Sequence, residues 1–195
     1  IAAWITDLQA TGSFTVNVLV PVPGYYLAAA LSSAIVARGT ASSPLTNSGI
    51  AGFVKVEKSN DYFRQNLLDT IAGGGNWIFE TKGPGAVVTR HQVSTDMSSI
   101  ETRELSITTA VDYAAKKLRE SVEGLIGKFN ISPSFIESLK KAFIHAGNVL
   151  VTDGVMDSVT VLKVEQDANE PDTINAEFDL GTLYPLNHIK ITLKF

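Results

Sequence analysis

Residues 171–195 read PDTINAEFDLGTLYPLNHIKITLKF and contain the two clearest strand patterns of the chain. Apolar and polar side chains alternate twice here, and this period of two places all the apolar side chains on one face of a strand. The apolar positions of the first run are Ile174, Ala176, Phe178 and Leu180. Those of the second are Ile189, Ile191, Leu193 and Phe195, with Lys190, Thr192 and Lys194 between them. We predict two strands, over 174–180 and 189–195, which the intervening turn 184–187 directs toward each other.

The second of these strands is not expected to be stable by itself. Burying its four apolar side chains contributes about 6–12 kcal/mol, at about 1.5–3 kcal/mol each. Ordering its seven residues costs about 7–14 kcal/mol, at about 1–2 kcal/mol each. The two amounts nearly cancel, so the strand needs a sheet to join. Because it comes last in the sequence, that sheet can belong to its own subunit or to a neighbour, and Lys190 and Lys194 suit an exposed sheet edge.

Two amphipathic helices are predicted upstream of these strands. Apolar residues recur at helical spacing between Ile107 and Leu125, and Gly127 ends that pattern. Ser132 and Pro133 then provide an N-cap and a first-turn proline for a second helix. The run 155–164 predicts a strand with a bulge where its alternation slips. Residues 91–195 therefore predict an α+β domain of two helices and a small, mostly antiparallel sheet.

Residues 1–90 predict an incomplete α/β domain. The expected order is a strand over 14–20, a helix over 25–37, a short strand over 53–56, a second helix and a hairpin. The second helix is expected to begin at Asn60 or Asp61 and to end at the glycines 73–75. Its expected buried side chains are Tyr62, Phe63, Leu67 and Ile71. The hairpin is expected to pair 77–79 with 86–88.

Composition excludes several classes of function. The 195 residues are 45% hydrophobic and 18% charged, which is enough apolar material for a packed core. A net charge of −4 is unlike that of a nucleic-acid binder, and the absence of cysteine removes thiolate metal sites and disulfides. The longest apolar stretch, 25–37, is too short to span a membrane. The chain begins with Ile1 and not with Met, so we expect it to be the end of a longer protein. We also expect it to bind no metal and no cofactor.

Three groups of residues are candidates for a site. His91 and Asp96, with Ser94 or Ser98, could form a hydrolase triad, but no G-x-S-x-G elbow accompanies them. The glycines 73–75 follow a helix and precede a strand, which is the wrong order for a phosphate-binding loop. Exposed basic residues on the two long helices are better candidates for contact with a partner, and they are Lys116, Lys117, Lys140 and Lys141.

The order of these segments resembles that of contractile phage tail sheath proteins. The similar stretches are YYLAAALSSAIVARG, SPLTNSGIAG, GGGNWIFE, RHQVSTD, SITTAVDYAAKKLRESVEGLIGKFN and PDTINAEFDLGTLYPLNHIKITLKF, which together extend from about Gly24 to Phe195. No single stretch is highly specific, and the resemblance rests on their common order. It implies that residues 1–90 are the end of a non-catalytic α/β sheath domain with subtilisin-like topology. Residues 91–195 would be the sheath C-terminal domain.

The resemblance also implies a structural function in the virion and no enzymatic activity. Sheath subunits stack as six-fold rings in a helical tube around the tail tube, and contraction drives that tube through the host envelope. The implied partners are other copies of the chain, the tail tube protein, and baseplate and terminator proteins, but neither nucleic acid nor membrane. Residues 189–195 would join a neighbour's sheet beside 174–180, and the four lysines would face the tube. The alternatives are the hydrolase and another tube or baseplate subunit.

Overall fold

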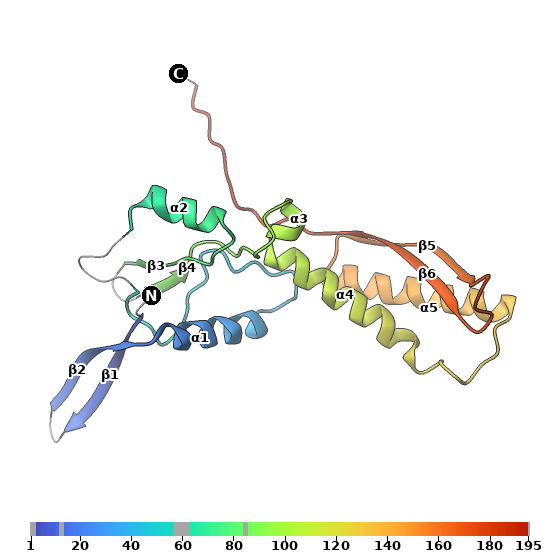
Figure 1. Ribbon diagram of the computed structural model, residues 1–195, viewed down its shortest axis with the longest axis horizontal. Helices are drawn as coiled ribbons and strands as arrows, with labels where there is room; N and C mark the ends of the chain where they lie inside the picture. The colour runs from blue at the N-terminus through green and yellow to red at the C-terminus, as the bar shows by residue number, and fades with distance from the viewer. Residues whose placement is uncertain (1–2, 12–13, 57–62, 84–85, 195) are drawn as a thin grey trace. The chain divides into compact units, whose positions relative to one another are not determined.

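The computed structural model describes residues 3–11, 14–56, 63–83 and 86–194 (Figure 1). Contacts divide the chain into two compact units. The first comprises the described parts of Ile1–Gly39, Pro44–Leu105 and Asn187–Phe195, and the second comprises Thr40–Ser43 and Ser106–Leu186. The chain passes between the units after Gly39, Ser43, Leu105 and Leu186. The sequence pattern predicts one domain boundary, after residue 90.

The described residues of the first unit form two antiparallel hairpins and three helices. Strand β1 (Ala3–Thr11) pairs with β2 (Phe14–Val22), and β3 (Phe79–Lys82) pairs with β4 (Ala86–Thr89). The helices are α1 (Gly24–Ala37), α2 (Gln65–Gly73) and the short α3 (Ile100–Arg103). One hydrophobic cluster holds the unit together, and its buried members are Leu27, Ile50, Phe53, Val56 and Val87.

Several predictions for this unit are confirmed and others are wrong. The strand at 14–20 and the helix at 25–37 are present. A hairpin is present too, but residues 86–88 pair with 80–82 and not with 77–79 as predicted. Strand β1 is an element that the sequence pattern does not predict. Residues 53–56 form no strand; Phe53 and Val56 are buried from a loop, because a short apolar run can indicate burial without strand structure. Helix α2 begins only at Gln65, so the proposed caps Asn60 and Asp61, with Tyr62, lie outside the described residues.

The buried face of α2 also differs from the prediction. Phe63 and Leu67 are 48% and 43% exposed, and Leu68 is the buried side chain. Phe63 lies before the start of the helix, and within the helix Leu68 rather than Leu67 is buried. The glycines after α2 form the predicted cap and turn: Gly74 is the C-cap, and Gly75 has a φ of +77°. A Cβ at Gly75 would stand 2.8 Å from the carbonyl oxygen of Ser94, so this tight turn requires glycine.

The second unit consists of two long helices and one two-stranded ribbon. Helix α4 (Leu105–Glu123) enters it from the first unit, and α5 (Pro133–Thr152) begins at the predicted cap, where the hydroxyl of Ser132 accepts from the backbone N–H of Phe135. Strand β5 (Ser158–Gln166) pairs antiparallel with β6 (Ile174–Gly181). The register shifts between Val161 and Lys163, which confirms the predicted bulge.

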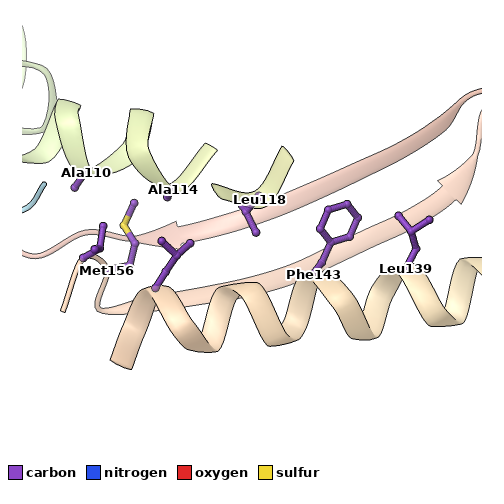
Figure 2. Packing of buried hydrophobic residues seen from close by; sticks show 8 residues of the cluster. Ala110, Ala114, Leu118, Leu139, Phe143 and Met156 are labelled. Atoms are coloured by element: carbon purple, nitrogen blue, oxygen red, sulfur yellow. The ribbon is translucent and has the colours of Figure 1, made fainter. Parts of the chain in front are cut away.

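The core of the second unit lies between these helices and the ribbon. Figure 2 shows side chains of α4, such as Ala114 and Leu118, facing side chains of α5, such as Phe143. The ring of Phe143 also meets that of Phe178 on β6 edge-to-face, with centroids 5.0 Å apart. The buried members of the cluster are Ala110, Ala114, Leu118, Leu139, Phe143, Leu150, Val155 and Met156.

The C-terminal segment is the main departure from the predicted fold. Residues 182–194 contain no strand in the structure, and Phe195 lies outside the described residues. Ile189, Ile191 and Leu193 are 73%, 80% and 84% exposed. Residues 189–194 therefore form no strand in the single chain, and the predicted pairing with a neighbour's sheet stays a prediction. The physical reason is the near balance of burial and ordering: without a sheet edge beside it, the segment loses more entropy than burial returns.

Close packing between α5 and β5 depends on one glycine. A Cβ on Gly147 would stand 2.9 Å from Cγ1 and 3.1 Å from Cβ of Val159. Because a valine is branched at Cβ, it cannot swing aside as a long side chain can. The helix therefore approaches the strand this closely only with glycine at position 147.

We expect Gly147→Leu to destabilise the chain by about 1–3 kcal/mol, because it overpacks the helix–strand contact. The matched control is Gly124→Leu, since a Cβ at Gly124 meets no atom within 4 Å. The control should stay within about 0.5 kcal/mol of the parent. Urea unfolding measures both variants, and equal midpoints for the two would contradict this role of Gly147.

The connection from β5 to β6 is organised by one carboxylate. Asp167 Oδ1 accepts from the backbone N–H of Asn169 at 2.7 Å and of Glu170 at 3.1 Å. Its Oδ2 accepts from the side-chain amide of Asn175 at 2.7 Å. The N–H of Asn169 first, and then the amide of Asn175, hold the pKa of Asp167 below its ordinary value. The ionised form of Asp167 thus favours the folded connection.

A lowered pKa in the folded state gives stability above the unfolded-state pKa, and this stability is lost as the pH falls through the folded value. We expect Asn175→Ala to raise the titration midpoint of Asp167, because it removes one donor. NMR titration of the Asp167 carboxyl carbon measures the midpoint. Asn148→Ala, at an exposed position of α5, is the control and should leave the midpoint in place. An unchanged midpoint in Asn175→Ala would refute the assignment.

Candidate functional site

The strongest candidate for a functional surface is an apolar groove in the second unit, beside the start of β6. Its volume is about 370 Å³. The end of α4 and the following turn form one side, the first half of α5 forms the floor, and β6 closes it through Ile174 and Ala176. The other apolar lining residues are Val122, Leu125, Ile126, Phe129, Ile131, Phe135, Leu139 and Phe143.

The turn after α4 keeps apolar side chains exposed at this groove. The helix ends at Glu123, and Gly127 reverses the chain with a φ of +75°. Ile126 is 77% exposed and Phe129 is 59% exposed, although the ring of Phe129 stacks on that of Phe135 with centroids 5.4 Å apart. Apolar surface gathered in this way is typical of a binding face.

The β5–β6 ribbon adds backbone groups to this surface. A two-stranded antiparallel sheet pairs only one side of each strand, so the opposite side of each strand presents N–H and C=O groups outward. Among the residues that the structure describes, no third strand joins β5 and β6. The predicted partner positions lie on β6: Ile174, Phe178 and Leu180 pack against the core, and Ala176 is exposed at the groove.

The C-terminal segment has the complementary properties. Its alternate residues Ile189, Ile191 and Leu193 are apolar and exposed, and Lys190, Thr192 and Lys194 between them are exposed as well. The chain thus carries an open sheet edge in one unit and a strand-like sequence without a strand partner in the other. The structure does not bring residues 189–194 and 174–180 into one sheet.

The predicted basic residues are all exposed, on two helices. Lys117 Nζ lies 2.8 Å from Glu120 Oε2, and Lys116 Nζ lies 3.7 Å from Glu120 Oε1. The hydrogen bond to Glu120 raises the pKa of Lys117, and the same bond lowers the pKa of Glu120. One carboxylate faces two ammonium groups, so this part of α4 keeps a net positive charge. Lys140 and Lys141 are exposed on α5.

The structure does not assemble the hydrolase triad. His91 Nε2 is 2.9 Å from Glu104 Oε1 and so pairs with a residue that no sequence pattern singles out. The Asp96 carboxylate accepts from the backbone N–H of Ser98, and its pKa is lowered by hydrogen bonds with Ser98. The Ser94 hydroxyl donates to the carbonyl of Thr102 at 2.7 Å. Each group serves local structure.

The described part of the chain holds neither the side-chain cluster of a metal site nor the helix of a membrane span. No three His, Asp or Glu side chains there lie close enough together to hold a metal ion. Among the same residues, no helix combines the length and the apolar character that crossing a bilayer requires.

Known proteins provide the context for this surface. No protein-family model matches the chain. A tail sheath protein of Mycobacterium phage Bxz1 is 29% identical over 173 residues, which cover 86% of this chain and 28% of that protein. This chain therefore spans only about a quarter of the curated relative that it matches.

Solved structures share the fold at low sequence identity. A chain in the anti-feeding prophage baseplate aligns with a TM-score of 0.73 and 11% identity, over 98% of this chain and 53% of that one. A chain of the anti-feeding prophage helical sheath in its contracted state aligns with a TM-score of 0.72 and 10% identity, over 99% and 54%. The resemblance to contractile tail sheath proteins is thus confirmed: in sequence by a phage sheath relative, and in fold by a chain from a contracted sheath.

Proposed function

We propose that this chain is the C-terminal part of a subunit of a contractile tail sheath. The observation that carries the proposal is the similarity to a phage tail sheath protein along 86% of the chain. Residues 1–90 would complete an α/β sheath domain, and residues 91–195 would form the C-terminal domain. The location of such a protein is the contractile tail of the virion, assembled in the host cytoplasm, and its function is mechanical.

Its partners would first be other copies of the same chain, stacked as hexameric rings in a helical tube. One solved neighbour is a chain of a helical sheath in the contracted state, and another belongs to a baseplate, which supports self-association and baseplate contact. The tail tube and the tail terminator complete the proposed set. Neither nucleic acid nor a membrane is among them.

The proposed link between subunits is exchange of the C-terminal strand. Residues 189–195 of one copy would pair with the β5–β6 ribbon of a neighbour, beside Ile174, Ala176, Phe178 and Leu180. Ile189, Ile191 and Leu193 would then leave water, and the ribbon edge would gain backbone partners. This pairing turns two features that are unfavourable in a single chain into one contact.

The exposed lysines of the two long helices are proposed to face the tail tube. Lys140 and Lys141 on α5, with Lys116 and Lys117 on α4, present positive charge in a chain whose net charge is −4. Electrostatic complementarity of this kind orients partners more than it tightens them. An acidic outer surface on the tube would be the matching partner.

The alternatives have less support. The hydrolase requires His91 beside Asp96, and His91 instead pairs with Glu104. A tube or baseplate subunit remains compatible with assembly through exposed edges, but the curated relative is a sheath protein. We therefore propose no turnover and no cofactor.

Deleting residues 189–195 from the longest natural chain that contains this sequence should abolish tube formation, because the neighbour's ribbon loses its added strand. Negative-stain electron microscopy checks this directly: the parent should form hollow, obliquely striated tubes and the deletion should not. The matched control replaces Lys190, Thr192 and Lys194 with alanine, which keeps the apolar face and should keep tubes. Normal tubes from the deletion would contradict strand exchange, and globular particles from the folded parent would contradict the sheath function.

A further inference from the structure

One buried carboxylate in the first unit lies outside the groove, the ribbon and the lysines of the proposed function. The Glu104 side chain is fully buried. Its Oε1 lies 2.9 Å from Nε2 of His91 and 3.0 Å from Nδ2 of Asn187. The side-chain amide of Asn187 donates to this oxygen, which also lies within hydrogen-bond distance of the His91 ring. Arg103 Nε stands 3.6 Å from the same oxygen.

The backbone around Glu104 is held on both sides. The N–H of Ser94 donates to the carbonyl of Arg103 at 2.7 Å, and the N–H of Leu105 donates to that of Gln92 at 3.1 Å. These two bonds make the antiparallel bridge between Val93 and Glu104. Glu104 is therefore a fixed point, and a hydrogen bond from its carboxylate fixes whatever donates to it.

Asn187, directly before the exposed residues 188–194 of the C-terminal segment, donates to this carboxylate. Asn187 is 83 residues from Glu104 in sequence, and it is half-buried. Directly after it the chain becomes exposed from His188 onward. The segment is thus held at its root by a buried carboxylate and is open along the length that carries Ile189, Ile191 and Leu193.

We propose that Glu104 is a positioning residue that anchors the root of the C-terminal segment through Asn187, so that each subunit presents the segment from a defined point. The proposal rests on the proposed function, in which the segment joins the ribbon of a neighbouring subunit. Fixing the root lowers the ordering cost when the segment joins a neighbour, because fewer residues have to be brought to their bound positions. It also keeps the free residues within a limited volume around the root, which raises their effective concentration at an adjacent ribbon.

Distance measurement between two spin labels tests the anchor in the isolated chain. The protein has no cysteine, so Ser33→Cys on α1 and His188→Cys after Asn187 give two defined labelling sites. Both positions are exposed and belong to the first unit. In the parent, pulsed electron paramagnetic resonance should give a narrow distance distribution. Asn187→Asp places a second carboxylate against Glu104, and the repulsion should broaden the distribution.

The exchanged pair Glu104→Gln with Asn187→Asp should restore the narrow distribution, since the amide at 104 then donates to the carboxylate at 187. A merely structural role for either residue would not give this recovery. Leu186→Ala, at the neighbouring position that is 78% exposed, is the control and should leave the distribution unchanged. Circular dichroism verifies that every variant is folded, and Asn187→Ala, which removes the donor without adding charge, should also broaden the distribution.

A distribution for Asn187→Asp and Asn187→Ala as narrow as that of the parent would overturn the anchor. Broadening that the exchanged pair does not reverse would overturn the assignment to Glu104. These readings do not depend on assembly. If tubes form without residues 189–195, strand exchange is refuted and the anchor is not affected. If tubes need these residues but the distance distribution of the parent is broad, the anchor is refuted and strand exchange is not affected.

Discussion

The outer backbone N–H and C=O groups of the β5–β6 ribbon need hydrogen-bond partners, and the role of the second unit depends on this constraint. Each strand of the ribbon pairs on one side only, and a sheet of two strands is marginal in water. The ribbon is held because one face packs on the helices through residues such as Val161 and Phe178. That packing leaves the edges available, and an available edge beside an apolar groove is a template for an added strand.

The helices provide the rigidity that such a template needs. Helix α5 lies close to β5 at Gly147, and the cluster around Phe143 joins α4, α5 and β6 into one core. A sheath that changes state under load must move subunits without unfolding them. In the proposed function, the packed helices keep each ribbon intact, and the connections between subunits run through residues that add little to the fold of the single chain.

Local patterns in the sequence predict the second unit well because its elements are long and contiguous. The cap at Ser132, the two apolar stripes and the slip in alternation near Leu162 each have a local physical cause. Predictions fail where structure depends on distant partners. Phe53 and Val56 belong to a predicted strand but pack from a loop, and residues 189–194 have a strand pattern without a strand partner among the residues that the structure describes.

The candidate surface could be predicted only in part, for the same reason. Alternation identifies the apolar residues of β6 and of the C-terminal segment, since period two is a local property. The groove has no such local signal, because it arises where the end of α4, the start of α5 and β6 meet. Nothing in the sequence around Glu104 marks it either: His91 and Asn187, which contact its carboxylate, stand 13 and 83 residues away.

The anchor and the proposed exchange place opposite demands on the C-terminal segment, and the chain meets them in different residues. Asn187 has to stay with its own subunit, whereas Ile189, Ile191 and Leu193 have to be released to another. Residues 188–194 extend at most about 23–25 Å, so the apolar side chains among them can reach a subunit in contact but not one further away. If the segment were held along its whole length it could not be shared, and if its root were free it would be shared with any neighbour. Because Asn187 is fixed, the exposed apolar residues after it can reach only the adjacent subunit, so distance selects the partner in addition to any side-chain contact.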